Sequence, residues 1–200
     1  KTLVLSGSGT LDASSDAFST SAWNAEYVKI GADVDIKSGL VFNHFNFVKA
    51  FEVDADSKYL CSPDSMLMSK DQTVLLKYPS RNNEFSFYTI PDTVKTISYA
   101  AFEYAPLKTV FLNDGLETIE GFAFSNSSLL YITIPGTVTS IGQSVLAQCS
   151  SITKVTFEEG VTAIPTSAFD RCRNLETVNL PDSLTTIGDI AFWDCTKLKS

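Results

Sequence analysis

The sequence has few of the residues from which most enzyme and metal sites are built. Of its 200 residues, one is a histidine, His44, and four are cysteines. No cysteines or histidines have the close spacing of a Cys-x-x-Cys metal motif, and the Gly-x-Ser-x-Gly nucleophile motif is absent. The sequence therefore predicts a protein that is not an enzyme, with no catalytic residue, no metal ligand and no cofactor.

Positive charge and long apolar runs are also scarce. The chain has 15 Lys and Arg against 23 Asp and Glu, a formal net charge of -8, with the charges spread rather than clustered. Nucleic-acid binding requires a basic footprint, and anionic membranes attract basic segments, so both partners are disfavoured. No stretch is long and apolar enough to insert into a membrane, and no signal peptide is visible. The composition suits a soluble, extracellular or cell-surface protein.

What the sequence does contain is a repeat of 22 to 23 residues. Its clearest markers are five isoleucines separated by 22, 22, 23 and 23 residues, Ile97, Ile119, Ile141, Ile164 and Ile187. Each is followed four and five residues later by a small residue and a large one, as in Ala101-Phe102, and then by alternating apolar positions, as at Val110 and Leu112. A fixed period in this range is the signature of a leucine-rich-repeat solenoid.

The period predicts how the chain packs. Each alternating segment is a short strand, and stacked copies bury their inner faces as one parallel sheet. The predicted fold class is an α/β-type leucine-rich-repeat solenoid. It is a right-handed superhelix with the parallel β-sheet on its concave face, mostly β and irregular coil, with little helix and one β-hairpin insert. Two interior stacks are expected, a spine of Phe102, Phe124, Phe169 and Phe192 and a ladder of thiols from Cys149, Cys172 and Cys195.

The N-terminal half follows the same period less regularly. Five apolar residues align with the last full repeat, Val28, Ile30, Val34, Phe42 and Val48. Lys37 falls where an isoleucine is expected, which predicts a one-residue slip to Ile36. The whole chain, 1–200, is predicted to be one domain. Its four parts are an N-terminal cap (1–23, with a polar loop from Asp12 to Ser21), early repeats (24–58), a β-hairpin insert (59–84) and regular repeats with an uncapped C-terminal end (85–200).

Two phrases of the sequence resemble the BspA-like leucine-rich repeats, one at residues 88–97 and the other at residues 187–195. The resemblance covers almost the whole chain and departs from the pattern at Lys37 and at Val145-Leu146. That family occurs on surface and secreted proteins of anaerobic oral and gut bacteria and in some protozoan parasites. The resemblance implies adhesion, through binding to host matrix proteins or to other cells.

The candidate binding surface is the outward side of the strands. Positions flanking each buried strand residue point away from the core, and the predicted ligand-binding residues are Phe87, Thr89, Thr109, Phe111, Tyr131, Thr133, Lys154 and Thr156. Thr suits strands without any ligand, whereas three aromatic rings on one exposed surface indicate a binding site. The alternative is that these rings pack on each other or under the hairpin. The hairpin tip, Ser69 to Gln72, is a competing site.

Three function classes follow. The first is a surface or secreted module that binds a host matrix or cell-surface protein, the second a structural spacer that displays other domains, and the third a carbohydrate-binding module. Other candidate residues have ordinary interpretations. His44 is expected in a surface loop, and the Asp33/Asp35 and Asp54/Asp56 pairs are expected to be solvated turn carboxylates, because they lack the further ligands of a calcium loop. Cys61 has no deducible partner.

Overall fold

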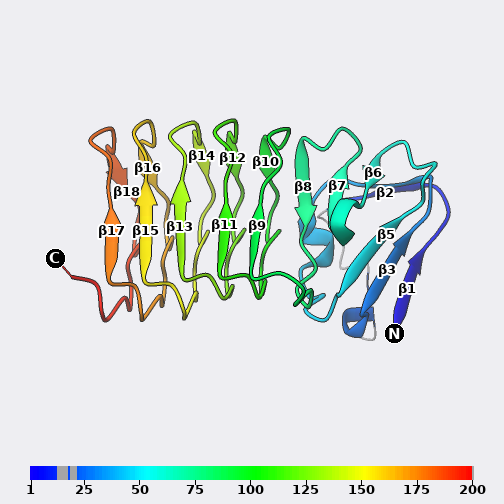
Figure 1. The fold of residues 1–200 in the computed structure, drawn as a ribbon, viewed down its shortest axis with the longest axis horizontal. Helices are drawn as coiled ribbons and strands as arrows, with labels where there is room; N and C mark the ends of the chain where they lie inside the picture. The colour runs from blue at the N-terminus through cyan, green and yellow to red at the C-terminus, as the bar shows by residue number, and fades with distance from the viewer. Residues whose placement is uncertain (13–17, 19–21, 200) are drawn as a thin grey trace.

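The computed structural model describes residues 1–12, 18 and 22–199. Over these residues the chain winds as a β-solenoid of stacked coils with parallel strands and almost no helix (Figure 1). The predicted solenoid is therefore confirmed. Most of the predicted polar loop from Asp12 to Ser21 lies outside the described residues.

The first strand ladder contains the alternating segments that the sequence predicted. Its strands are β1 (Thr2–Leu5), β3 (Tyr27–Ile30), β5 (Ala50–Val53), β9 (Phe87–Thr89), β11 (Thr109–Phe111), β13 (Tyr131–Ile134), β15 (Lys154–Phe157) and β17 (Thr177–Asn179). Strands pair in parallel with equivalent positions side by side, for example Ile132 with Val155 and Val155 with Val178. We call the outward side of β9 to β17 the strand face.

A second ladder of short strands lies on the other side of the coils (Figure 1). It contains β2 (Gly9–Leu11), β4 (Val34–Ile36), β10 (Thr96–Ile97), β12 (Thr118–Ile119), β14 (Ser140–Ile141), β16 (Ala163–Ile164) and β18 (Thr186–Ile187). The five marker isoleucines occupy the second position of the two-residue strands β10, β12, β14, β16 and β18, and equivalent isoleucines pair, as Ile97 does with Ile119. The sequence predicted only coil here, because strands of two or three residues are too short to show an alternating pattern.

The rest of each coil contains left-handed backbone at two repeating positions. Ten non-glycine residues there have φ between 49° and 60°, namely Ala100, Tyr104, Phe122, Asn126, Ser144, Gln148, Ser167, Arg171, Ile190 and Asp194. Their N–H groups aim at the next coil, as Asn126 N donates to Ala147 O at 2.9 Å and Gln148 N to Asp170 O at 2.7 Å. In this part of the coil alternate N–H groups point to the next coil, as those of Ala100, Phe102 and Tyr104 do, which gives neighbouring coils a third line of hydrogen bonds.

The aromatic spine forms inside the coils as predicted, although in two parts. Phe102 and Phe124 stack with ring centroids 5.2 Å apart, and Phe169 and Phe192 stack at 5.1 Å. Leu146 separates the two pairs, while Tyr78 extends the first pair at 5.3 Å from Phe102. The core is thus built by stacking like on like at one position of successive coils.

The cysteine ladder is also present, and its thiols serve as hydrogen-bond donors. The Sγ atoms of Cys149, Cys172 and Cys195 donate to main-chain carbonyls of the preceding coil at 3.0, 3.0 and 3.1 Å. All four cysteines of the chain are free. The interaction with the Cys149 thiol and, after it, burial raise the pKa of Cys172, and burial raises the pKa of Cys195, which keeps these two thiols protonated and able to donate.

The N-terminal coils bury the five residues aligned from the sequence, and Ile36 is buried where Lys37 is exposed, so the one-residue slip is confirmed. Three short 3-10 helices lie among the described residues of this half, η1 (Ala22–Asn24), η2 (Gly39–Phe42) and η3 (Pro63–Ser65).

The predicted hairpin is confirmed and joins the second ladder. β7 (Leu67–Ser69) runs antiparallel to β6 (Leu60–Cys61) and to β8 (Val74–Lys77), and β8 pairs in parallel with β10. Neighbouring hairpin residues face opposite cores. Leu67 belongs to the N-terminal core cluster, and Met66 and Met68 belong to the larger cluster of the regular repeats. The hairpin is therefore the wall between two hydrophobic cores.

The left-handed positions yield a stability prediction. Gln148 is exposed with φ 60°, so Gln148→Gly should raise the free energy of unfolding by about 1 kcal/mol, because glycine removes the Cβ clash of that conformation. Gln143 is an exposed glutamine outside the left-handed set, so Gln143→Gly should lower it by about 0.5–1 kcal/mol. Urea unfolding of both variants measures the two changes. Equal effects at the two positions would contradict this account of the backbone.

Candidate functional site

Three aromatic side chains stand exposed on the strand face. Phe87, Phe111 and Tyr131 are 58%, 46% and 48% exposed, and each occupies an outward position of its strand. Their inward neighbours pack in the core, with Val110 and Ile132 buried and Tyr88 half-buried. Alternation along the strand therefore forces the three rings outward, where they contribute little to the core.

The other predicted site residues differ in their exposure to solvent. Thr89, Thr133 and Lys154 are exposed, and Thr156 is half-buried, with its hydroxyl accepting a hydrogen bond from Asn179 Nδ2 at 3.1 Å. The expectation for Thr109 was wrong, because this residue is buried.

The burial of Thr109 has a simple cause. Thr109 pairs with Phe87 on one side, and its hydroxyl donates to the main-chain oxygen of Tyr131 on the other at 3.3 Å. A small side chain between two large rings is covered by them, so Thr109 supports the surface and does not offer its hydroxyl to a ligand.

The strand pairing of the strand face is interrupted near these rings. β9 pairs with β11, and β13 pairs with β15, but no pairing joins β11 to β13. A shallow cavity of ≈ 260 Å³ lies at this break, with Phe111 and Tyr131 among its lining residues and Asp114 and Glu158 adding carboxylates. Phe87 and Phe111 meet edge to face, with centroids 6.2 Å apart and planes at 67°. The rings thus contact each other, as the alternative interpretation expected, while remaining about half exposed.

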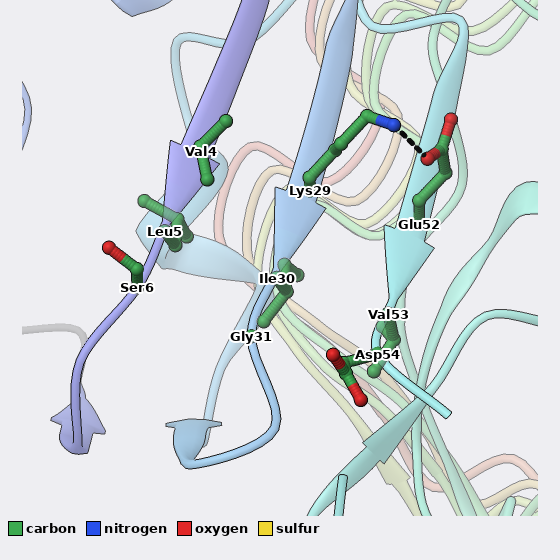
Figure 2. Close-up of a pocket in the computed structure, with 9 residues that line it drawn as sticks. All are labelled: Val4, Leu5, Ser6, Lys29, Ile30, Gly31, Glu52, Val53 and Asp54. Carbon is green, nitrogen blue, oxygen red and sulfur yellow. Dashed lines mark ion pairs between the residues drawn. The ribbon is translucent and has the colours of Figure 1, made fainter. Parts of the chain in front are cut away.

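A second cavity, of ≈ 290 Å³, lies on the outward side of the N-terminal strands β1, β3 and β5 (Figure 2). In Figure 2 the side chains of Lys29 and Glu52 reach toward each other, and they form an ion pair at 2.6 Å. Because the two charges compensate each other, this cavity has no free cation with which to select a ligand.

A third cavity, of ≈ 350 Å³, lies where the chain enters β3 and β5 and leaves the hairpin insert. Its lining includes Phe47, Lys49 and Arg81. No pattern in the sequence indicated this site. Arg81 and Val48 lie on opposite sides of the insert in the sequence, and the fold brings them together, with the main-chain N–H of Arg81 donating to Val48 O at 2.7 Å. A period of 22 to 23 residues gives no signal for a contact that spans 33.

The isolated candidates are accounted for by local contacts. His44 is exposed, with its ring centroid 4.4 Å from that of Trp23. Asp54 lies in an exposed turn, where its Oδ1 accepts from Asp56 N at 2.9 Å. The expectation for Asp35 was wrong: it is a buried residue of β4, a strand of the second ladder that pairs with β2, and it forms an ion pair with Lys37 at 2.6 Å.

The polar groups of the hairpin tip form hydrogen bonds with one another. Asp71 Oδ1 accepts from Ser69 Oγ at 2.7 Å and from Thr73 N at 3.1 Å. These bonds lower the pKa of Asp71, with the Ser69 contribution the largest. The carboxylate at the tip is therefore occupied in shaping the turn.

The structure buries one lysine side chain whose burial the sequence did not predict. Lys77, at the end of β8, is 2% exposed, and its Nζ donates to Ala100 O at 2.6 Å. Burial lowers the pKa of Lys77 to about 8, against the opposing effect of Glu103. Burial also raises the pKa of Glu103, whose Oε2 has no hydrogen-bond partner among the described residues. Lys77 is buried and Glu103 is half-buried, so we regard the pair as structural.

Two further observations concern the described residues as a group. Across residues 1–12, 18 and 22–199, no three His, Cys, Asp or Glu side chains gather closely enough to hold a metal ion. The same part of the chain contains no helix with the length and apolar character needed to cross a membrane.

Comparison with known proteins gives a consistent result. Residues 78–199 match the BspA type leucine rich repeat region in 6 copies. No curated protein matches the chain. The fold resembles a leucine-rich repeat protein from Eubacterium ventriosum ATCC 27560, with a TM-score of 0.83 and 30% identity over 88% of this chain and 48% of that one.

Two more distant structures share the fold. The pneumococcal vaccine antigen PcpA aligns with a TM-score of 0.60 and 24% identity over 88% of this chain and 46% of that one. The leucine-rich repeat protein of T. pallidum aligns at 0.57 and 19% identity over 100% and 78%. The chain thus spans about half the length of the Eubacterium and pneumococcal proteins.

The burial of Lys77 predicts how the free energy of unfolding depends on pH. The folded state releases the Lys77 proton near pH 8, whereas the unfolded chain holds it to its ordinary pKa of 10.5. The unfolded state then binds more protons between these values, so this lysine makes the protein more stable as pH rises. The unfolding free energy of the wild type minus that of Lys77→Met should increase by about 2 kcal/mol between about pH 7.5 and about pH 10.

Denaturant titrations of both proteins across this range measure the difference, in which the other ionisable groups cancel. A difference that stays flat, or falls, with pH would show that the folded state does not depress the pKa of this ammonium group.

Proposed function

The chain belongs to the BspA-type leucine-rich-repeat family, and on this premise we propose that it is a non-enzymatic binding module of an extracellular or cell-surface protein. The proposed ligand is a protein of a host matrix or cell surface, which docks on the strand face. The proposed contact residues are Phe87, Thr89, Phe111, Tyr131, Thr133, Lys154 and Thr156.

The exposed aromatic cluster is the observation that carries this proposal. Phe87, Phe111 and Tyr131 come from three neighbouring strands and keep about half of their surface in water. Aromatic side chains dominate the binding energy of many interfaces, and contiguous exposed apolar surface marks interaction sites. A scaffold that only displayed other domains would gain nothing from exposing three rings in one place.

The surroundings of the rings favour a protein ligand over a sugar. Phe87 and Phe111 lie at 67° to each other, so they do not form one flat platform for a sugar ring. Threonine hydroxyls, the Lys154 ammonium and the Asp114 and Glu158 carboxylates surround them. An apolar centre with a mixed polar rim is the usual composition of a protein–protein interface.

The direct test is a triple variant, Phe87→Ala/Phe111→Ala/Tyr131→Ala, screened beside the wild type against extracellular-matrix proteins and a glycan array. A wild-type protein ligand should lose at least 2 kcal/mol of binding free energy, a Kd rise of about 30-fold or more, because anchor rings at interface centres contribute about this much each. The matched control is Tyr59→Ala/Tyr104→Ala/Trp193→Ala, which removes three rings that are 44%, 42% and 52% exposed away from the strand face.

The outcomes separate the function classes. Binding that is lost in the face variant and kept in the control supports the proposal. Equal binding by the wild type and the face variant would remove the strand face as the site. Hits confined to the glycan array would assign a carbohydrate-binding module, and no ligand in either screen would favour a spacer.

A further inference from the structure

The cavity beside Arg81 is chemically unlike the strand face. Its lining holds two cations, two carboxamides, one carboxylate and one exposed ring, from Asn24, Glu26, Phe47, Lys49, Arg81 and Asn83. Main-chain bonds hold the three contributing segments together, with Lys49 N donating to Glu26 O and Arg81 N to Val48 O, both at 2.7 Å. The site is therefore built on the same coil-to-coil bonding as the rest of the solenoid.

Two contacts within the chain orient the guanidinium group of Arg81. Its Nε donates to Asn46 O at 3.3 Å, and its central carbon lies 5.4 Å from the ring centroid of Phe47. Within the described part of the chain, its two terminal nitrogens have no hydrogen-bond partner. A planar fork that is already oriented loses little entropy on binding, and its free edge suits a carboxylate.

The charges around the cavity leave this fork uncompensated. Lys49 Nζ lies 2.5 Å from Glu26 Oε2, so the only carboxylate of the lining is already paired. The positive charge of Arg81 then remains unbalanced, although the chain as a whole is formally -8.

We propose that this cavity binds an acidic peptide segment, with one Asp or Glu side chain of the partner held by the Arg81 fork. The carboxamides of Asn24 and Asn83 provide donors and acceptors for the flanking peptide groups, and the exposed edge of Phe47 contacts the adjoining side chain. The volume of ≈ 350 Å³ suits one side chain with its neighbouring peptide groups.

A peptide fits better than an acidic sugar because of the role of the ring. A sugar binds aromatic residues through an open ring face, and in Phe47 the guanidinium of Arg81 lies over the face. This second site is independent of the strand face, and a protein ligand could use either or both.

The test uses a fluorescent, capped peptide Gly-Glu-Asp-Glu-Gly, the uncharged analogue Gly-Gln-Asn-Gln-Gly, and sialyllactose as the acidic sugar. Anisotropy is measured for the peptides, and NMR chemical-shift changes of the arginine Nε–H signals are followed for all three. We expect the acidic peptide alone to bind and to shift the Arg81 signal. Arg81→Gln should raise its Kd at least 10-fold, and Arg81→Lys should raise it several-fold, because lysine keeps the charge but not the fork.

Arg171→Gln is the matched control. The guanidinium carbon of Arg171 lies over the ring of Trp193, 5.1 Å from its centroid, at the other end of the molecule. This variant should leave peptide binding unchanged, as should the triple variant of the strand face. Absence of peptide binding, equal binding of the uncharged analogue, or a Kd unaffected by Arg81→Gln would each overturn the proposal. Binding of sialyllactose alone would overturn it in favour of an acidic-sugar site.

Discussion

Hydrogen bonding between successive coils is the constraint on which the rest of this structure depends. Successive coils bond to one another through strand pairs of the two ladders, through loop main-chain bonds and through the N–H groups of the left-handed positions, so equivalent residues stack on one another. Like therefore packs on like, as the pairs Phe102–Phe124 and Phe169–Phe192 and the ladder of cysteine thiols do.

The same constraint decides where function is free to evolve. Inward positions must fill a repeating core, and left-handed positions must tolerate positive φ. Outward strand positions need only a residue that is compatible with strand backbone. The aromatic cluster stands at such positions, above the break between β11 and β13. The Arg81 cavity lies at another place where repetition is relaxed, beside the segment that leaves the hairpin insert. Both proposed sites lie where the stacking pattern is interrupted.

The sequence predicted the features that the spacing and alternation of apolar residues reveal, and missed those that leave no trace in that pattern. The period, the first strand ladder, the phenylalanine spine and the exposure of Phe87, Phe111 and Tyr131 all follow from alternation and spacing. The second ladder was missed because its strands are only two or three residues long. The left-handed backbone was missed because the residues there are not glycines. Thr109 was misjudged because burial under neighbouring rings depends on side-chain size across three strands. Lys77 and Arg81 owe their surroundings to the insert, for which the period carries no information.

The central claim is that inward rings hold the coils together while the rings of the strand face are free to bind. The most direct measurement is the free energy of unfolding of two double variants, Phe102→Ala/Phe124→Ala and Phe87→Ala/Phe111→Ala. Removing the buried pair should cost about 6 kcal/mol or more, and removing the exposed pair about 2 kcal/mol or less, because only the first opens cavities in the core. Similar losses for the two pairs would mean that the exposed rings serve the fold, and the account of the strand face as a binding surface would be contradicted.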